Sequence, residues 1–245
     1  MERALELDDT LAEAHNAKAT VSLFYDWDWA AAERELKRSR ELNLNGAEAS
    51  LIYPAYFKTL GRFDESIAEA KRAQEIDPLS PFATSELADA YYFSRQYDEA
   101  IKQGARALEI DPRFRLAYHV RGRALAQKGM YREAIAELQK WAENNRDPQA
   151  IGSLGQVYGM SGQRDKALEA LAELERISKE RYVPSYWKAI VYVGLNDKEQ
   201  ALYWMEKAYE ERYFLLIWIG GDPRFDPLRS DPRFTDLLRR MNLAA

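Results

Sequence analysis

The order of apolar, small and polar positions in this chain repeats every 34 to 36 residues. Each unit holds two helical stretches separated by a short turn, with small residues spaced so that the helices can pack closely. The second helix of each unit is expected to end beside one of the following residues: Leu44, Pro78, Pro112, Pro148 and Pro184. A repeat of this length predicts a solenoid, in which each helix pair packs on its neighbours and the assembly presents a binding surface.

Two features recur inside the units. Turns are expected at residues 61–64, 95–98, 129–132 and 162–165, and glycine begins most of them because it suits the left-handed backbone that closes a helix. The sequence Asp-Pro closes two units, at Asp77 and Asp111. We expect it to stop one helix and open the next, since Asp caps a helix and Pro fits its first turn.

Several positions within the units match one known repeat. The eighth position is small at Ala88, Gly122 and Gly155, although Pro54 departs from this, and the turn between the helices carries an aromatic residue in most units. The pattern resembles the tetratricopeptide repeat. The resemblance covers nearly the whole chain and implies an all-α, right-handed superhelix of about six helix pairs with a C-terminal capping helix.

We therefore expect one domain over residues 1–245. Its parts are a partial repeat at 1–10, repeats at 13–45, 47–78, 81–112, 115–148, 148–181 and 182–211, and a cap at 222–243. The motif Asp-Pro-Arg-Phe occurs twice in the cap, and each Asp can cap a helix that its Pro begins. The cap ends in apolar residues at helical spacing that suit a lid on the last repeat: Phe234, Leu237, Leu238 and Met241. Since residues 1–10 hold half a helix pair, we expect the chain to be a fragment of a longer protein.

The register of the repeats also predicts a binding groove. In such a stack the first helix of each unit lines the concave face, and counting along these helices gives eight polar or aromatic candidates for peptide binding: Tyr25, Lys58, Asp89, Tyr92, His119, Arg123, Gln127 and Gln156. Aromatic platforms beside Arg, His and Gln donors suit an extended peptide that carries carboxylates. The sequence leaves open the alternative that these side chains pack between repeats.

Composition narrows the function classes. The net charge of −5 argues against a nucleic-acid surface, although residues 113–132 carry six basic residues and no carboxylate, which a solvated helix face also explains. The chain has no cysteine, which fits a reducing compartment, and its charged first residues do not form a signal peptide, so we expect a cytoplasmic protein. The apolar run at residues 213–219 is too short for a membrane span.

The sequence offers no candidate for catalysis, and we expect neither an enzyme nor a cofactor or metal. His15 and His119 lie three repeats apart, so they cannot form one site. Gly152, Gly155 and Gly159 lie at helical spacing without a preceding strand, so close helix packing explains them better than a phosphate loop.

The pattern as a whole favours a scaffold that binds a protein or peptide in its groove. The first unit, with Trp27, Asp28 and Trp29 in its turn, the later repeats and the Asp-Pro-Arg-Phe tail together resemble the C-terminal repeat regions of bacterial winged-helix regulators, serine/threonine kinases and nucleotide cyclases. This resemblance implies the interaction arm of a larger regulator. Two alternatives remain, namely self-assembly through the N-terminal half-repeat, and a sensor that binds a small ligand between aromatic residues.

Overall fold

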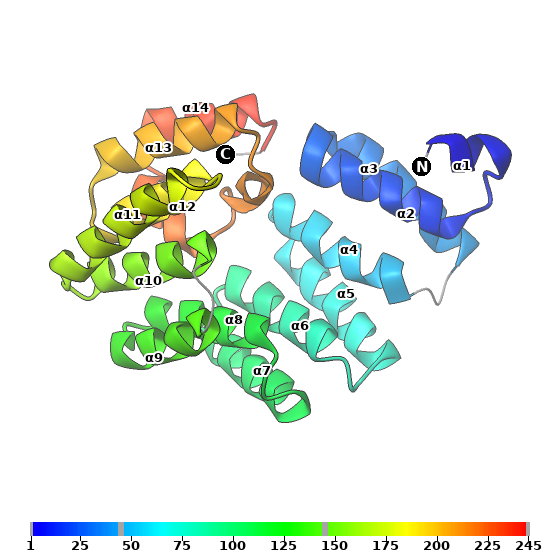
Figure 1. Cartoon of the computed structure of the whole chain (residues 1–245). Coiled ribbons are helices and arrows are strands. Elements are labelled where there is room, and N and C mark those ends of the chain that lie inside the picture. The colour runs from blue at the N-terminus through cyan, green and yellow to red at the C-terminus, as the bar shows by residue number, and fades with distance from the viewer. Residues whose placement is uncertain (1, 44–46, 144–146, 244–245) are drawn as a thin grey trace.

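The computed structural model describes residues 2–43, 47–143 and 147–243, and within these ranges the chain is helical and has no strand. Leu44, expected to close the first full unit, and the boundary expected at residue 45 lie outside the described residues. The short α1 (Glu2–Leu7) packs on α2, and helix pairs then follow one another around an arc (Figure 1). The fold is therefore the all-α solenoid that the repeat pattern predicts.

Each pair consists of a first helix and a second helix that pack against each other. The first helices are α2 (Ala12–Val21), α4 (Ala47–Thr59), α6 (Pro81–Phe93), α8 (Arg115–Gln127), α10 (Pro148–Met160) and α12 (Ser185–Gly194). The second helices are α3 (Trp29–Leu42), α5 (Phe63–Ile76), α7 (Tyr97–Ile110), α9 (Tyr131–Ala142), α11 (Arg164–Ser178) and α13 (Lys198–Glu210). Most second helices also pack on the first helix of the next pair, which joins the pairs into one stack.

The turns inside the pairs share one backbone conformation. Gly61, Gly129 and Gly162 have φ angles of 69°, 74° and 78°, which confirms the prediction of a left-handed residue at these positions. Arg95 and Asn196 adopt the same conformation, with φ angles of 64° and 57°; asparagine tolerates it, whereas the arginine side chain opposes it. The repeated contacts of the helix pair therefore impose the turn even where the local sequence does not favour it.

The expectation that Asp-Pro opens the next helix is wrong at two of its sites. Asp77 and Asp111 accept hydrogen bonds from the backbone N–H two residues later, and the next helices begin only at Pro81 and Arg115. A short Asp turn therefore precedes the helix at these places. At the third repeat boundary with this sequence, Asp147 does cap a helix directly, by accepting a hydrogen bond from Gln149 N at the start of α10.

Close packing of α10 on α12 explains the three glycines of α10, as predicted. A Cβ atom added at Gly159 would lie 2.5 Å from the backbone carbon of Gly194, and one added at Gly155 would lie 2.8 Å from the Val191 side chain. At Gly152 the obstacle is Trp187. The absence of side chains at these positions allows the two helices to approach backbone to backbone.

The chain after α13 turns back into the arc. Two short 3-10 helices, η2 (Phe214–Trp218) and η3 (Pro223–Leu228), contact α4 and α12 on the inner side of the arc, and α14 (Pro232–Arg240) then packs on α13. In Figure 1 this orange segment runs inside the arc and not along its outer edge. Residues 222–228, expected to form part of the cap, thus lie on the concave side, while the apolar face of α14 is buried in the core.

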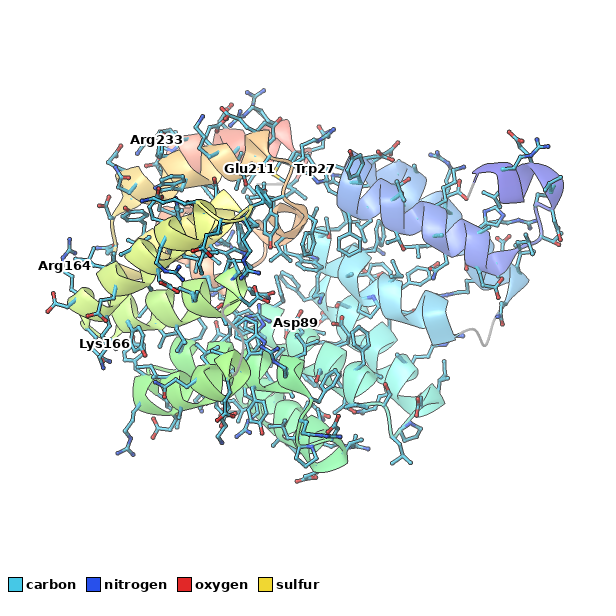
Figure 2. All side chains as sticks on the ribbon, viewed as in Figure 1. Trp27, Asp89, Arg164, Lys166, Glu211 and Arg233 are labelled. Atoms are coloured by element: carbon cyan, nitrogen blue, oxygen red, sulfur yellow. The ribbon has the colours of Figure 1, made fainter. Side chains whose placement is uncertain are left out.

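The two ends of the arc meet. The Trp29 indole nitrogen donates to the backbone oxygens of Met241 at 3.2 Å and Asn242 at 3.1 Å. The ring of Trp27 lies 5.6 Å from that of Tyr209. Figure 2 places Trp27 beside the C-terminal helices, where the first helix pair faces them. The two tryptophans of the unusual first turn therefore connect the first unit to the last, which closes the solenoid on itself.

Candidate functional site

The structure gathers most of the predicted groove residues on the concave side. Six of the eight are buried on four successive first helices: Lys58, Asp89, Tyr92, His119, Arg123 and Gln156. Gln127 is half-buried at the end of α8. Tyr25 lies in the π-helical turn η1 (Ser22–Asp26) and is 69% exposed. Asp89 is near the middle of the arc (Figure 2).

These residues are buried because residues 214–228, which contain η2 and η3, occupy the groove. We call these residues the inserted segment. The Tyr92 hydroxyl donates to Asp222 Oδ1 at 3.0 Å, and the Trp218 indole nitrogen donates to the Ala55 backbone oxygen at 3.2 Å. Farther out, the Arg95 guanidinium binds both carboxylate oxygens of Asp226, at 2.5 and 2.8 Å. Part of the predicted peptide groove therefore holds a segment of the same chain, and the role of its residues in binding a partner stays a prediction.

An ion network crosses the groove between α4, α6 and α8. The Lys58 ammonium lies 2.5 Å from Asp89 Oδ2, and Arg123 pairs with the other oxygen of the same carboxylate. Burial alone would raise the pKa of Asp89, but the two cations outweigh it and hold this pKa well below its usual range. Burial likewise would lower the pKa of Lys58, and Asp89 and Glu86 raise it instead. Both charged forms are thus favoured.

Neighbouring Glu86 behaves differently from Asp89. It lies 3.4 Å from Lys58 as its second carboxylate partner, and burial raises its pKa more than the cations lower it. The network therefore holds Asp89 ionised and places a more easily protonated carboxyl beside it.

A second buried ion pair lies on η3. Asp222 is 1% exposed and accepts hydrogen bonds from the Arg224 guanidinium at 2.6 and 2.9 Å, as well as from its backbone N–H at 3.0 Å. Arg224 also donates to the hydroxyl of Tyr186 on α12, at 3.1 Å. Burial would raise the pKa of Asp222, but Arg224 lowers it. This pair anchors the inserted segment to α6 and α12.

His119 lies between these networks without joining either. Its ring stacks on Trp141 with 4.1 Å between ring centres, and the side chain is 4% exposed. Neither ring nitrogen has a hydrogen-bond partner among the described residues. Burial lowers the pKa of His119 well below its ordinary value of 6.5, and Arg123 and Arg224 lower it further. The imidazole is therefore neutral near pH 7.

A cavity of about 210 Å³, called the central cavity below, remains between the groove and the inserted segment. Its polar lining includes the following side chains: Lys58, Glu86, Asp89, His119, Arg123, Gln149 and Arg224. Its walls are largely aromatic and include Phe93, Trp187, Phe214 and Trp218. The cavity therefore brings apolar surface and several buried charged groups together in one place.

Counting positions along the repeats could not identify the site residues that belong to the inserted segment. Asp222, Arg224 and Trp218 lie more than one hundred positions from most of the groove residues that surround them. Two signals in the sequence point to their role. The apolar run at residues 213–219 needs a buried environment, and the first Asp-Pro-Arg-Phe motif directly follows it.

Within the described ranges, no group of three or more His, Asp or Glu side chains is arranged to hold a metal ion. Nor does any helix in those ranges have the length and apolar character that a bilayer span requires.

No protein-family model matches the sequence, and no curated protein matches it. Solved structures do match the fold. A tetratricopeptide repeat protein from Parabacteroides merdae is 14% identical with a TM-score of 0.67, over 98% of this chain and 89% of that chain. PilW, described as a widely conserved type IV pilus biogenesis factor, is 20% identical with a TM-score of 0.62, over 71% of this chain and 81% of its own. The tetratricopeptide repeat protein TTC0263 from Thermus thermophilus is 22% identical with a TM-score of 0.56, over 80% of this chain and 97% of its own.

These similarities show the fold. The chain is a tetratricopeptide-repeat solenoid, as its repeat pattern predicts. Its resemblance to the C-terminal arms of bacterial regulators stays a prediction.

Proposed function

We propose that the chain is a non-enzymatic scaffold that binds a segment of a protein partner at its concave face. The observation that carries this proposal is that the groove already binds polypeptide within the molecule. Side chains and backbone from α4, α6 and α12 hold residues 214–228 through the contacts of Trp218, Asp222 and Arg224. A surface built in this way suits a further chain segment laid beside the first.

The exposed aromatic edge of the groove is where we expect the partner to lie. Phe214 lines the central cavity and is 45% exposed, and its ring lies 6.3 Å from that of Phe24, the neighbour of exposed Tyr25. Exposed aromatic side chains supply large contact areas at low entropic cost. Because the cavity beside this edge holds unused guanidinium donors on Arg123 and Arg224, a partner segment that carries carboxylates fits this edge best.

Site-specific photo-crosslinking tests the proposal. A photoreactive phenylalanine analogue replaces Tyr25 or Phe214 in separate variants, and Tyr203, an exposed tyrosine on the second helix α13, serves as the matched control. We expect one protein to be captured from both groove-edge positions and not from Tyr203. Capture from Tyr203 alone would move the interface to α13, and no capture from any of the three positions would contradict the scaffold function.

The wider role is also a proposal. The repeats and tail support the interaction arm of a larger bacterial regulator, and the lack of cysteine supports a cytoplasmic setting. Because the net charge is negative, we propose protein partners and neither nucleic acid nor a membrane surface. The reading frame upstream of Met1 tests the role directly, since a kinase, cyclase or winged-helix domain there would identify the regulator, and an unrelated frame would contradict it.

Self-assembly is a second candidate function. The side chain of Leu7 on α1 is 75% exposed, which leaves an apolar surface that a second copy of the chain can cover. Light scattering over a range of concentrations tests this. Oligomers that grow with concentration and disappear in Leu7→Glu would support it, and a monomer at every concentration would remove it.

A further inference from the structure

The central cavity has the features of a small-molecule site. It is about 210 Å³ in volume, which exceeds the roughly 150 Å³ of an engineered cavity that binds benzene. Most of its polar lining is buried, while Glu86, Gln149, Phe214 and several apolar lining residues are partly exposed to solvent. A one-ring molecule therefore fits the space and has a way in.

Three side chains in the lining have unused hydrogen-bonding capacity. Arg123 Nε, Arg224 Nη1 and both ring nitrogens of His119 are buried, and none has a partner among the described residues. The three residues are 8%, 7% and 4% exposed. Burying a polar group without a partner costs about 1–3 kcal/mol, so several such groups around one cavity indicate that a ligand supplies their partners.

His119 is the most informative of the three. A second void of about 10 Å³ touches Arg123 and Arg224, and a void of that size holds at most one water molecule. His119 does not line that void but does line the central cavity. The unused nitrogens of His119 therefore point to the central cavity as the place where a partner is needed.

The chemistry of the lining defines the ligand. The guanidinium groups of Arg123 and Arg224 keep unused donors, although Asp89 already pairs with the first and Asp222 with the second. Since these carboxylates leave guanidinium donors unused, the missing partner is a hydrogen-bond acceptor, and a carboxylate is the acceptor that a guanidinium binds most strongly. The aromatic walls favour a planar apolar body over a bare inorganic anion. We propose that this cavity binds a small aromatic carboxylate of about one ring in size.

Such a ligand would touch three parts of the molecule at once. Arg123 belongs to α8, Trp187 to α12, and Phe214 and Arg224 to the inserted segment. A molecule that binds all of them stabilises the closed groove, because it binds the folded chain and not the unfolded one. Phe214 also belongs to the groove edge of the proposed function, so ligand and protein partner share this side chain.

Isothermal titration calorimetry on the full chain tests the proposal. Phenylacetate and benzoate are titrated as probes, with phenylacetamide and benzamide as neutral molecules of the same shape. We expect saturable binding of at least one carboxylate and at least about tenfold weaker binding of its amide, since a charge-assisted hydrogen bond is replaced by a neutral one. No saturable binding of either carboxylate to the folded wild type overturns the proposal.

Two variants locate the binding. His119→Phe keeps the stacking on Trp141 and removes the two unpaired nitrogens, so we expect it to fold normally and to bind the carboxylate about tenfold more weakly. Leu116→Trp fills the cavity from a partly exposed position and is expected to abolish binding. Unchanged affinity in both folded variants would place the ligand elsewhere and contradict the inference.

The titration and the crosslinking are independent. Calorimetry uses the purified chain alone, so it can succeed where the groove edge captures no protein. Conversely, capture at Tyr25 and Phe214 together with a failed titration would contradict only the ligand site.

Discussion

Replacing Asp222 with alanine is expected to remove the anchor of the inserted segment. The substitution deletes every hydrogen bond that Arg224 makes to this carboxylate and leaves a guanidinium that is 7% exposed with Tyr186 as its remaining partner. It also deprives the Tyr92 hydroxyl of its acceptor. Breaking a buried ion pair by removing one partner costs about 3–5 kcal/mol. This is a large fraction of the 5–15 kcal/mol that stabilises a typical domain.

Urea unfolding followed by far-ultraviolet circular dichroism measures this loss. The chain contains a matched control in Asp231, which opens the second Asp-Pro-Arg-Phe motif, caps the following helix in the same way and is far less buried. We expect Asp222→Ala to lose about 3–5 kcal/mol and Asp231→Ala to lose clearly less, because water can replace the lost contacts of a partly exposed group. Equal losses in the two variants would refute the reasoning that the inserted segment is held by a buried network.

A double-mutant cycle assigns the loss to the groove. Tyr92→Phe removes only the hydroxyl that donates to Asp222. We expect it to cost about 1 kcal/mol in the wild type and close to nothing once Asp222 is alanine, since the two groups then no longer interact. Additive effects would show that Tyr92 and Asp222 are not in contact.

Three further predictions follow from separate parts of the fold. Gly159→Ala is expected to lower the free energy of unfolding by about 1–3 kcal/mol because its new methyl group meets the backbone of α12. Gly220→Ala is the control and is expected to be nearly neutral, since a Cβ atom there would lie 3.6 Å from its nearest neighbour, a Leu238 methyl group. Thermal unfolding of the two variants compares these effects. The lowered pKa of His119 means that the unfolded chain takes up a proton as pH falls through about 6.5 and the folded chain does not. Stability is therefore lost progressively as the pH falls below about 6.5, by up to about 1.4 kcal/mol per pH unit more than in His119→Phe, as urea titrations at each pH can measure. Asn196→Ala places a residue that disfavours a φ angle of 57° at this turn and is expected to lower the melting temperature, with a loss of about 1 kcal/mol; an unchanged melting temperature would show that the turn does not need a residue that tolerates this conformation.

The fold could be predicted from the sequence because its determinants are local. Gly61, Gly129 and Gly162 mark the turns, and the spacing between the units sets the register of the first helices. The glycines of α10 signal close packing by their helical spacing alone. Arg95 and Trp27, by contrast, occupy the same turn position without a favourable local sequence, so only the repeat itself reveals their conformation.

The candidate site could be predicted only in part. Register placed Lys58, Asp89, His119 and Arg123 on the concave face, and the structure brings these four side chains to one cavity. Four further lining residues come from positions 214–224, whose contacts with the groove depend on how a long solenoid curves back on its own tail. Periodicity reports which face of a helix is apolar, and it carries no information about which distant segment covers that face.

Hydrogen–deuterium exchange of residues 214–228 tests most directly whether the chain fills its own groove. Backbone hydrogen bonds within this segment, such as Asp222 N to Trp218 O at 2.9 Å, are covered by α4, α6 and α12. We predict that these amides exchange as slowly as those of α6, and that Asp222→Ala accelerates them together. Complete exchange of the segment in seconds, while α6 stays protected, would show that the groove is open and would contradict both the buried network and the cavity built upon it.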